Sequence, residues 1–258
     1  MDYSTIQYAV RDDVAVIMLN RPDVMNALNT QMRAEITHAV RAAEKEARVV
    51  VLTGSGKAFC SGQDLGDGGS AAALDLERTL RDEYVPMLRA IIDCKIPTIA
   101  AVNGPAAGAG ANLALVTDIV IASYDAYFVQ AFSRIGLIPD AGGTHFLPRQ
   151  IGLARAMGAM MFGDKVSATQ AADWGMIYEA VPSSEFVGHY TQRAVQLAKG
   201  PTATYGYLKD ALRATSDNTL EQQLALEAKL QGKCGKTRDF QEGVVAFLEK
   251  RPASFEGR

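Results

Sequence analysis

The sequence predicts an α/β protein with a largely parallel sheet and a helical C-terminal part. Over residues 6–181, short apolar runs alternate with helical patterns, an order typical of βαβ units. From residue 184 to residue 250 the pattern is helical, with breaks expected at Gly200-Pro201 and at 232–235. We therefore expect a core over residues 1–199 and a helical part over 200–258, which packs on its own core or on a neighbouring subunit.

Apolar periodicity predicts the individual elements in chain order. Residues 6–19 predict a hairpin that turns at Asp12-Asp13, and residues 30–46 predict a helix with one apolar face. After this helix come continuous apolar runs, of the kind that is buried on both faces of a parallel sheet. Further strands are expected at 49–54, 97–102, 118–122 and 176–181, and further helices at 72–94, 151–161 and 167–174.

Composition and charge argue against several classes of function. The 258 residues are 48% hydrophobic and 21% charged, which is ordinary for a soluble globular protein. A net charge of −3 gives no support to a nucleic-acid partner or an anionic membrane. Apolar runs stay shorter than the roughly 20 residues that a membrane helix needs. The 3 cysteines and 3 histidines are widely spaced, so we expect a cytoplasmic protein with neither a disulfide framework nor a metal site.

A glycine-rich stretch after the apolar run at 97–102 can form an anion site from backbone groups. It reads Asn103-Gly-Pro-Ala-Ala-Gly-Ala-Gly-Ala-Asn112, and its small residues let a helix begin close to the strand with unpaired N–H groups. Two nucleotide-binding motifs do not match. A phosphate-binding P-loop would need Ser or Thr after Lys57 of Gly54-Ser-Gly-Lys57, but Ala58 follows it, and Leu113 occupies the third glycine position of a dinucleotide-binding motif. Close helix–strand packing is the alternative, and it does not exclude an oxyanion site.

Two further loops contain candidate functional groups. Asp140 lies in a Pro-Asp-Ala-Gly-Gly turn among apolar residues, which beside an oxyanion site suggests proton transfer next to a carbonyl. Residues 57–65 follow a buried strand and can expose the N–H of Gln63 where ligands bind in α/β folds. The alternatives are a turn aspartate that caps a helix and a purely structural turn. Cys60 is not expected to be a nucleophile, and His145 is a pocket residue or a partly buried surface group.

Together these motifs resemble the crotonase (enoyl-CoA hydratase/isomerase) superfamily over essentially the whole chain. The matching segments are Leu19-Asn-Arg-Pro22, Asn26-Ala-Leu28, 57–65, 103–110, 135–144, 167–172 and Phe247-Leu-Glu-Lys250. The resemblance implies a crotonase-type spiral of ββα repeats and an acyl-CoA substrate, with no cofactor because CoA is part of the substrate. It also implies a homotrimer or a hexamer made of two trimers.

The resemblance further implies roles for individual residues. The backbone N–H groups of Gln63 and Ala109 would form the oxyanion hole, and Asp140 would be the acid/base. The residues expected to contact CoA or the acyl group are Val24, Met25, Ala27, Ser61, Gln63, Asp64, Leu65, Asn112, Phe132, Phe247 and Lys250. Phe247 and Lys250 would lie near the CoA of a neighbouring subunit.

The chain departs from the hydratase pattern at its carboxyl groups. Asn112 and Phe132 stand where hydratases have two glutamates, and Asp140 stands where some isomerases and a dehalogenase of the superfamily have aspartate. Residues 130–140 most resemble the isomerases that convert ring-1,2-epoxyphenylacetyl-CoA to oxepin-CoA in phenylacetate breakdown. Because moving a double bond needs one base whereas hydration needs two groups, we expect a CoA-thioester isomerase. A Δ3,Δ2-enoyl-CoA isomerase, a hydratase and an inactive scaffold of the same fold are the alternatives.

Overall fold

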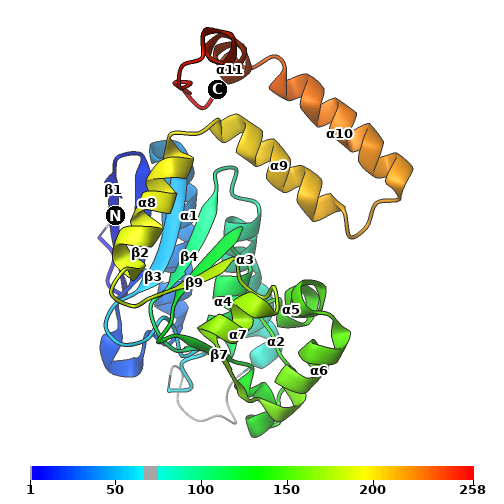
Figure 1. Ribbon diagram of the computed structural model, residues 1–258. Coiled ribbons are helices and arrows are strands. Elements are labelled where there is room, and N and C mark those ends of the chain that lie inside the picture. The colour runs from blue at the N-terminus through cyan, green and yellow to red at the C-terminus, as the bar shows by residue number, and fades with distance from the viewer. Residues whose placement is uncertain (1, 67–74) are drawn as a thin grey trace.

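Two sheets organise the core of the computed structural model, which describes residues 2–66 and 75–258 (Figure 1). The larger sheet has 6 strands in the order β1-β2-β3-β4-β6-β9, and the smaller has 3 in the order β5-β7-β8. The strands are β1 Ile6–Arg11, β2 Val14–Leu19, β3 Val49–Gly54, β4 Thr98–Val102, β5 Ala106–Ala107, β6 Ile119–Ser123, β7 Tyr127–Val129, β8 Lys165–Ser167 and β9 Glu179–Val181. The predicted α/β class with a largely parallel sheet is confirmed.

The large sheet is parallel except at its N-terminal edge. Strands β1 and β2 form the predicted antiparallel hairpin, and the turn places Asp12 and Asp13 at φ 51° and 60°, a left-handed conformation that aspartate tolerates. Strands β2, β3, β4, β6 and β9 then pair in parallel. Every residue of β3 and β4 is buried, as expected of strands covered on both faces.

Helices cover both faces of this sheet. The helical segments are η1 Pro22–Val24, α1 Thr30–Glu46, α2 Leu76–Thr79, η3 Leu80–Tyr84, α3 Val85–Ile92, α4 Ala109–Leu115, η4 Ala131–Ile135, α5 Gly143–Ile151, α6 Leu153–Phe162, α7 Ala168–Asp173, α8 Phe186–Ala198, α9 Thr202–Ala214, α10 Leu220–Cys234 and α11 Arg238–Glu249. Helices α1, α3 and α4 enclose the main apolar core on one face, and α8 closes a smaller core on the other. Side chains cap several of them; Asn29, for example, accepts a hydrogen bond from the N–H of Met32 at 2.9 Å.

Some predicted boundaries are wrong for identifiable physical reasons. The sequence predicted no helix over residues 143–150, but α5 forms there and contains Pro148 two-thirds of the way along its length. Helix α10 continues through Gly232, since one glycine weakens a helix without ending it. A break at 215–219, which sequence reasoning missed, separates α9 from α10. The start of the helix predicted at 72–94 lies outside the described residues.

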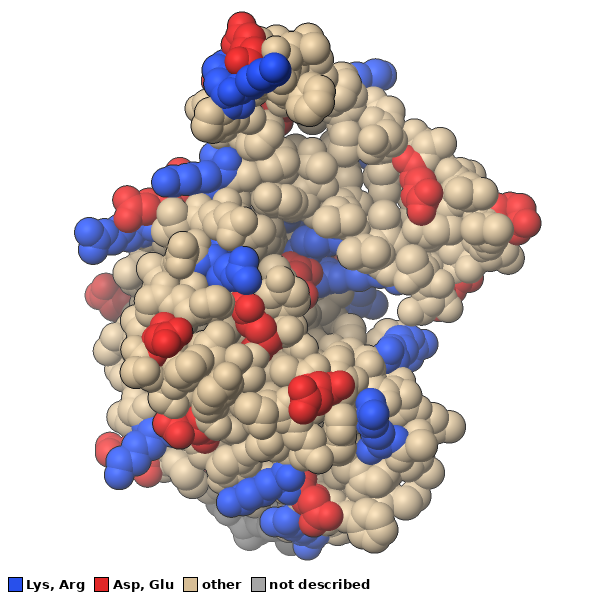
Figure 2. Space-filling model, in the orientation of Figure 1, with Lys and Arg blue, Asp and Glu red and all other residues tan. Residues whose placement is uncertain are grey.

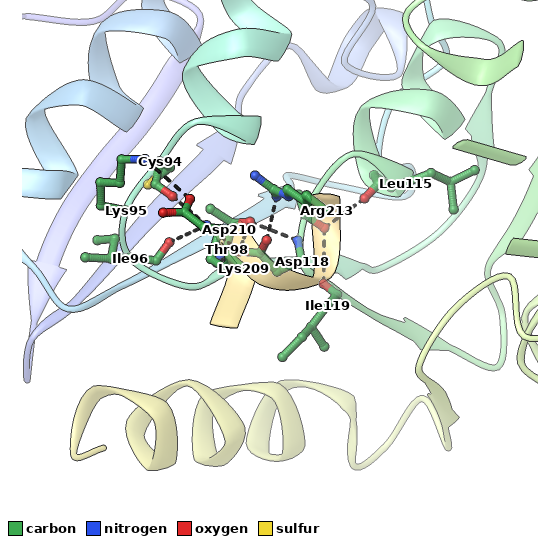
Figure 3. A network of polar contacts seen from close by, with 12 residues as sticks. Cys94, Lys95, Ile96, Thr98, Leu115, Asp118, Ile119, Lys209, Asp210 and Arg213 are labelled. Carbon is green, nitrogen blue, oxygen red and sulfur yellow. Dashed lines mark hydrogen bonds and ion pairs between the residues drawn. The ribbon is translucent and has the colours of Figure 1, made fainter. Parts of the chain in front are cut away.

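The last three helices project from the core (Figure 1). Figure 3 shows the polar contacts that hold α9 to the core: the Nζ of Lys209 donates to the carbonyl oxygens of Cys94 and Ile96 at 2.6 and 2.8 Å. Lys209 also pairs with Asp118 at 2.6 Å, and Arg213 pairs with the other oxygen of the same carboxylate at 2.6 Å. Ion pairs and hydrogen bonds therefore hold α9, the first of the three helices, against the core.

Helix α11 exposes an apolar surface. Its exposed apolar side chains are Phe240, Val244, Val245, Phe247 and Leu248, and Phe247 is 82% exposed. On the face of the molecule shown in Figure 2, side chains of both charges are interspersed and neither sign gathers into one patch. Within the described parts of the chain, no helix combines the length and the apolar character needed to span a membrane.

Candidate active site

A cavity of about 810 Å³ opens at the carboxyl ends of β3 and β4. Its walls are the loop after β3, the turn before α4, the helical segments α2, η3, α3 and η4, and the turn before α5. Six residues predicted from the sequence to form the site line it: Ser61, Gln63, Leu65, Ala109, Phe132 and Asp140. Most other walls are apolar side chains, including Leu80, Leu88, Leu137 and Ile138. An apolar pocket with a few convergent polar groups is typical of small-molecule sites.

The loop after β3 and the turn before α4 touch through their backbones. The N–H of Ala107 donates to the carbonyl of Cys60 at 2.9 Å. Gly62 has φ 98°, and a Cβ there would lie 2.8 Å from the oxygen of Ala107 and 3.3 Å from the nitrogen of Ala109. Only glycine fits this approach, so it brings the backbones of residues 62–63 and 107–109 together.

Two residues that line the cavity, Gln63 and Ala109, have backbone N–H groups without an acceptor among the described residues. Where Leu28 and Gln63 form a parallel bridge, Leu28 donates to Gly62 at 2.8 Å and Asp64 donates to Leu28 at 3.1 Å. The N–H of Gln63, which lies between these two bonds, therefore points to the other side. Ala109 is the first residue of α4, and the first N–H groups of a helix have no partner within it. Unpaired backbone N–H groups of this kind are suited to binding an anion.

Asp140 places a desolvated carboxyl group in the same cavity. Its Oδ1 is buried and makes no hydrogen bond within the described structure. Burial disfavours the charged form and raises the pKa of Asp140 to about 6. At neutral pH this carboxylate is consequently a stronger base than an exposed aspartate, which suits it to proton transfer.

An unusual turn holds Asp140 in place. Ala141 and Gly142 follow it with φ 48° and 82°, and the left-handed conformation costs a residue such as alanine roughly 1–2 kcal/mol. The carbonyl of Asp140 accepts two hydrogen bonds, from the N–H of Gly143 and from the Nδ2 of Asn112, both at 2.8 Å. These bonds offset the strain in the turn.

Asn112 lies behind this turn and does not line the cavity. Its side chain is buried, and its Oδ1 accepts from the Nε2 of Gln130 at 2.8 Å, so both ends of the amide are occupied. A Cβ at Gly143 would overlap the Asn112 side chain, which shows how closely α4 and α5 meet there. The predicted contact between Asn112 and the substrate therefore has no support in the geometry of this chain. Phe132, by contrast, presents its ring to the cavity beside Gly108.

Other residues predicted for CoA binding lie beside the loop that lines the cavity. Asp64 pairs with Arg21 at 2.8 Å, and the hydroxyl of Ser61 donates to the carbonyl of Val24 at 3.2 Å. Met25 is 55% exposed beside them, whereas Ala27 is buried. The turn at 24–27 thus lies against the loop at 61–64.

Phe247 and Lys250 lie apart from the cavity within one chain. Figure 1 places α11 at the opposite end of the molecule from α2, which borders the cavity. His145 is exposed and does not line the cavity. Cys60 is buried, and burial raises the pKa of its thiol to about 12, which agrees with the prediction that it is no nucleophile. Within the described residues no cluster of metal-ligating side chains forms.

Sequence reasoning missed a buried polar cluster under the cavity. The Oε1 of Gln63 accepts from the Nη1 of Arg33 at 2.9 Å and from the hydroxyl of Tyr84 at 2.6 Å. Arg33 also pairs with Glu83 at 2.5 Å. Residues 80–84 form a π-helix, which a search for a 3.6-residue period does not detect. One feature of the sequence could have indicated the cluster: Arg33 is a charged residue on the apolar face of α1.

Known proteins of similar sequence share this architecture. Residues 10–258 match the family described as enoyl-CoA hydratase/isomerase. A Rhodobacter capsulatus protein named "Probable enoyl-CoA hydratase" is 58% identical over 258 residues, which is 100% of both chains. The 1,2-epoxyphenylacetyl-CoA isomerase of Escherichia coli K12 is 44% identical over 254 residues, covering 96% of this chain and 97% of its own.

Solved structures agree on the fold. The enoyl-CoA hydratase of Bacillus anthracis superposes with a TM-score of 0.91 at 30% identity, over 99% of this chain and 100% of its own. A Geobacillus kaustophilus protein, whose structure is described as subunit I of such an enzyme, reaches 0.93 at 34% identity over 100% of both chains. The chain therefore belongs to the enoyl-CoA hydratase/isomerase (crotonase) family, whose members act on CoA thioesters.

Proposed function

We propose that the protein is a CoA-thioester isomerase in which Asp140 is the single acid/base. The observation behind this proposal is one apolar cavity that combines two unpaired N–H groups with one desolvated carboxyl group. Glu77 is the other carboxylate among the described lining residues, but it is exposed and paired with Arg81. Asp140 is consequently the better base.

The proposed reaction passes through a thioester enolate. The thioester oxygen lies between the N–H groups of Gln63 and Ala109, and the carboxylate of Asp140 removes a proton from the acyl chain. The electron pair of that C–H bond moves toward the thioester, and the two N–H groups stabilise the negative oxygen that forms. One such donor contributes roughly 3 kcal/mol in comparable sites. Asp140 then returns the proton to a different carbon, which completes the isomerisation of a 3-enoyl ester without a cofactor. With a ring epoxide, the C–C bond between the two epoxide carbons also breaks, so the six-membered ring opens to a seven-membered oxepin and no atom is gained or lost.

Hydration is the alternative activity, and the name of the Rhodobacter capsulatus relative raises it. Adding water requires a second group that orients the water molecule. The two positions where hydratases have glutamates hold Phe132, which is apolar, and Asn112, whose amide is already bonded to Gln130 and Asp140. These contacts favour isomerisation over hydration.

The proposed substrate is the ring-1,2-epoxide of phenylacetyl-CoA, which would be converted to oxepin-CoA. Two observations support it: the apolar walls of the cavity and the 44% identity to a relative named for an epoxyphenylacetyl-CoA reaction. A 3-enoyl-CoA is the second candidate, because the same base and oxyanion donors would move its double bond. We place the enzyme in the cytoplasm.

Substrate assays test the assignment. Purified protein is assayed separately with crotonyl-CoA, a cis-3-enoyl-CoA and the epoxide generated in the reaction mixture. Each product is followed by its mass and its ultraviolet absorbance. We expect both isomerisations and only slow hydration. Rapid gain of one water by crotonyl-CoA, with no isomer product from the other two substrates, would identify a hydratase instead.

Replacing Asp140 by asparagine tests the acid/base role. The amide keeps the size of the side chain but cannot take up the proton, so turnover should fall by ~100-fold or more while CoA-ester binding stays within a few-fold. In the parent protein, kcat/KM should rise with pH through about 6, the pKa of Asp140 in the free enzyme, because the base must be ionised. Turnover of Asp140→Asn within threefold of the parent would refute the assignment.

Asn112→Ala tests whether the turn must be held in place. Loss of the bond to the Asp140 carbonyl should loosen the strained turn and lower kcat by ~10- to 100-fold with little change in KM, since small misplacements of a reacting group are costly. Asn218→Ala is the matched control, because Asn218 makes a similar amide contact to Gln223 on the C-terminal helices. Equal kcat values for Asn112→Ala and the parent would show that the turn needs no such support.

The helical part at 200–258 is proposed to assemble subunits into a trimer or a hexamer. The apolar surface of α11 supports this, and assembly would bring Phe247 and Lys250 to the CoA of a neighbour. Light scattering should detect the trimer or hexamer at micromolar concentration, whereas a monomer would contradict the proposal. If the oligomer forms, Phe247→Ala should raise KM for CoA esters and leave kcat within a few-fold.

A further inference from the structure

Arg33 is a buried cation that the proposed reaction does not use directly. It extends from α1 and is 2% exposed. Its Nε and Nη2 bond to Oε2 of Glu83 at 3.1 and 2.5 Å, and its Nη1 donates to the carbonyl of Leu28 at 2.6 Å. Its guanidinium carbon lies 4.9 Å from the ring centroid of Tyr84. Burying a charge is costly unless it is paired, and these contacts compensate that cost.

The same guanidinium holds the side chain of Gln63 in one orientation. The Oε1 of Gln63 accepts from Arg33 at 2.9 Å and from the hydroxyl of Tyr84 at 2.6 Å, and its Nε2 donates to the carbonyl of Asp64 at 3.2 Å. Three hydrogen bonds therefore fix the side chain of Gln63, and the backbone N–H of this residue is one of the two proposed oxyanion donors. Leu28, which forms the bridge to Gln63, is held by Arg33 as well.

We call the contacts of Arg33 and Tyr84 with the Gln63 side chain the clamp. Tyr84 connects this clamp to the cavity wall. It ends the π-helix η3, and it is both buried and among the lining residues. Burial raises the pKa of Tyr84, so its hydroxyl stays protonated and remains a donor to Gln63. The clamp thus joins α1, the loop after β3 and η3 around a single amide.

We propose that Arg33 is a positioning residue of the reaction, which acts through the Gln63 side chain to aim the Gln63 N–H at the thioester oxygen. This inference rests on the proposed function, because it assumes that the thioester oxygen binds between Gln63 and Ala109. Donors that are aligned before charge develops stabilise a transition state more than donors that must reorient. Arg33 therefore contributes to turnover more than to substrate affinity.

Infrared difference spectroscopy of a bound thioester tests the inference without requiring turnover. The probe is butanoyl-CoA labelled with ¹³C at its carbonyl, a saturated ester that the proposed isomerisation does not consume. Hydrogen bonds lower the carbonyl stretching frequency, so the parent protein should lower it relative to the ester in water. The test variant is Arg33→Met combined with Glu83→Gln, which removes both charges and leaves neither one buried alone.

In this double variant the frequency should return toward its value in water, and kcat should fall by ~10-fold or more with KM within about threefold. Tyr84→Phe removes one donor to Gln63 without changing charge, and should give a smaller shift in the same direction. The control is Arg89→Met combined with Asp93→Asn, which deletes an exposed ion pair on α3 and should match the parent.

The outcomes separate the inference from the proposed function. If Arg33→Met/Glu83→Gln and Tyr84→Phe both keep the parent's frequency and kcat, the positioning role of Arg33 is wrong. A parent protein that leaves the frequency at its value in water would remove the oxyanion site itself, and the inference with it. Asp140→Asn should retain the parent's frequency, so a failed acid/base assignment leaves this measurement unaffected.

Discussion

The close contact between two backbone segments is the constraint on which the site depends. Because Gly62 has no Cβ, the loop after β3 can lie against residues 107–109 at the start of α4. The segments come from neighbouring parallel strands, whose carboxyl ends meet at one edge of the sheet. Sheet topology and one missing methyl group therefore bring together the backbones of the two residues whose N–H groups are unpaired. Side chains then supply the remaining chemistry around this backbone centre.

Two buried networks support the two halves of the site from behind. On one side, Asn112 donates to the backbone carbonyl of Asp140, and Gln130 in turn holds the Asn112 amide. On the other side, Arg33 and Tyr84 hold the side chain of Gln63. Neither network places a charge next to the carboxyl group of Asp140, so this group stays in apolar surroundings. The separation lets the protein combine a rigid polar framework with a desolvated base.

Sequence reasoning predicted the elements that have clear periods. The strands β3, β4 and β6 and the helix α1 follow from apolar patterns, and α1 has the predicted bounds. The short strands β5, β7 and β8 were missed because two or three residues show no period. The π-helix and the cluster around Arg33 were also missed, since contacts between residues 30 and 50 positions apart leave no local signal. The glycine-rich turn and Asp140 were found because their chemistry is local in the sequence.

The surroundings of Asp140 also affect the thermodynamics of folding. Its pKa of about 6 in the folded protein exceeds the 3.8 expected of an exposed aspartate, so the folded state binds its proton more tightly than the unfolded chain does. The stability that this proton binding contributes is fully present below pH 3.8 and is lost as pH rises through 6. At neutral pH the loss corresponds to roughly 3 kcal/mol, a substantial fraction of the stability of an ordinary domain. Keeping the carboxylate of Asp140 desolvated before any substrate binds thus lowers the stability of the folded chain at neutral pH.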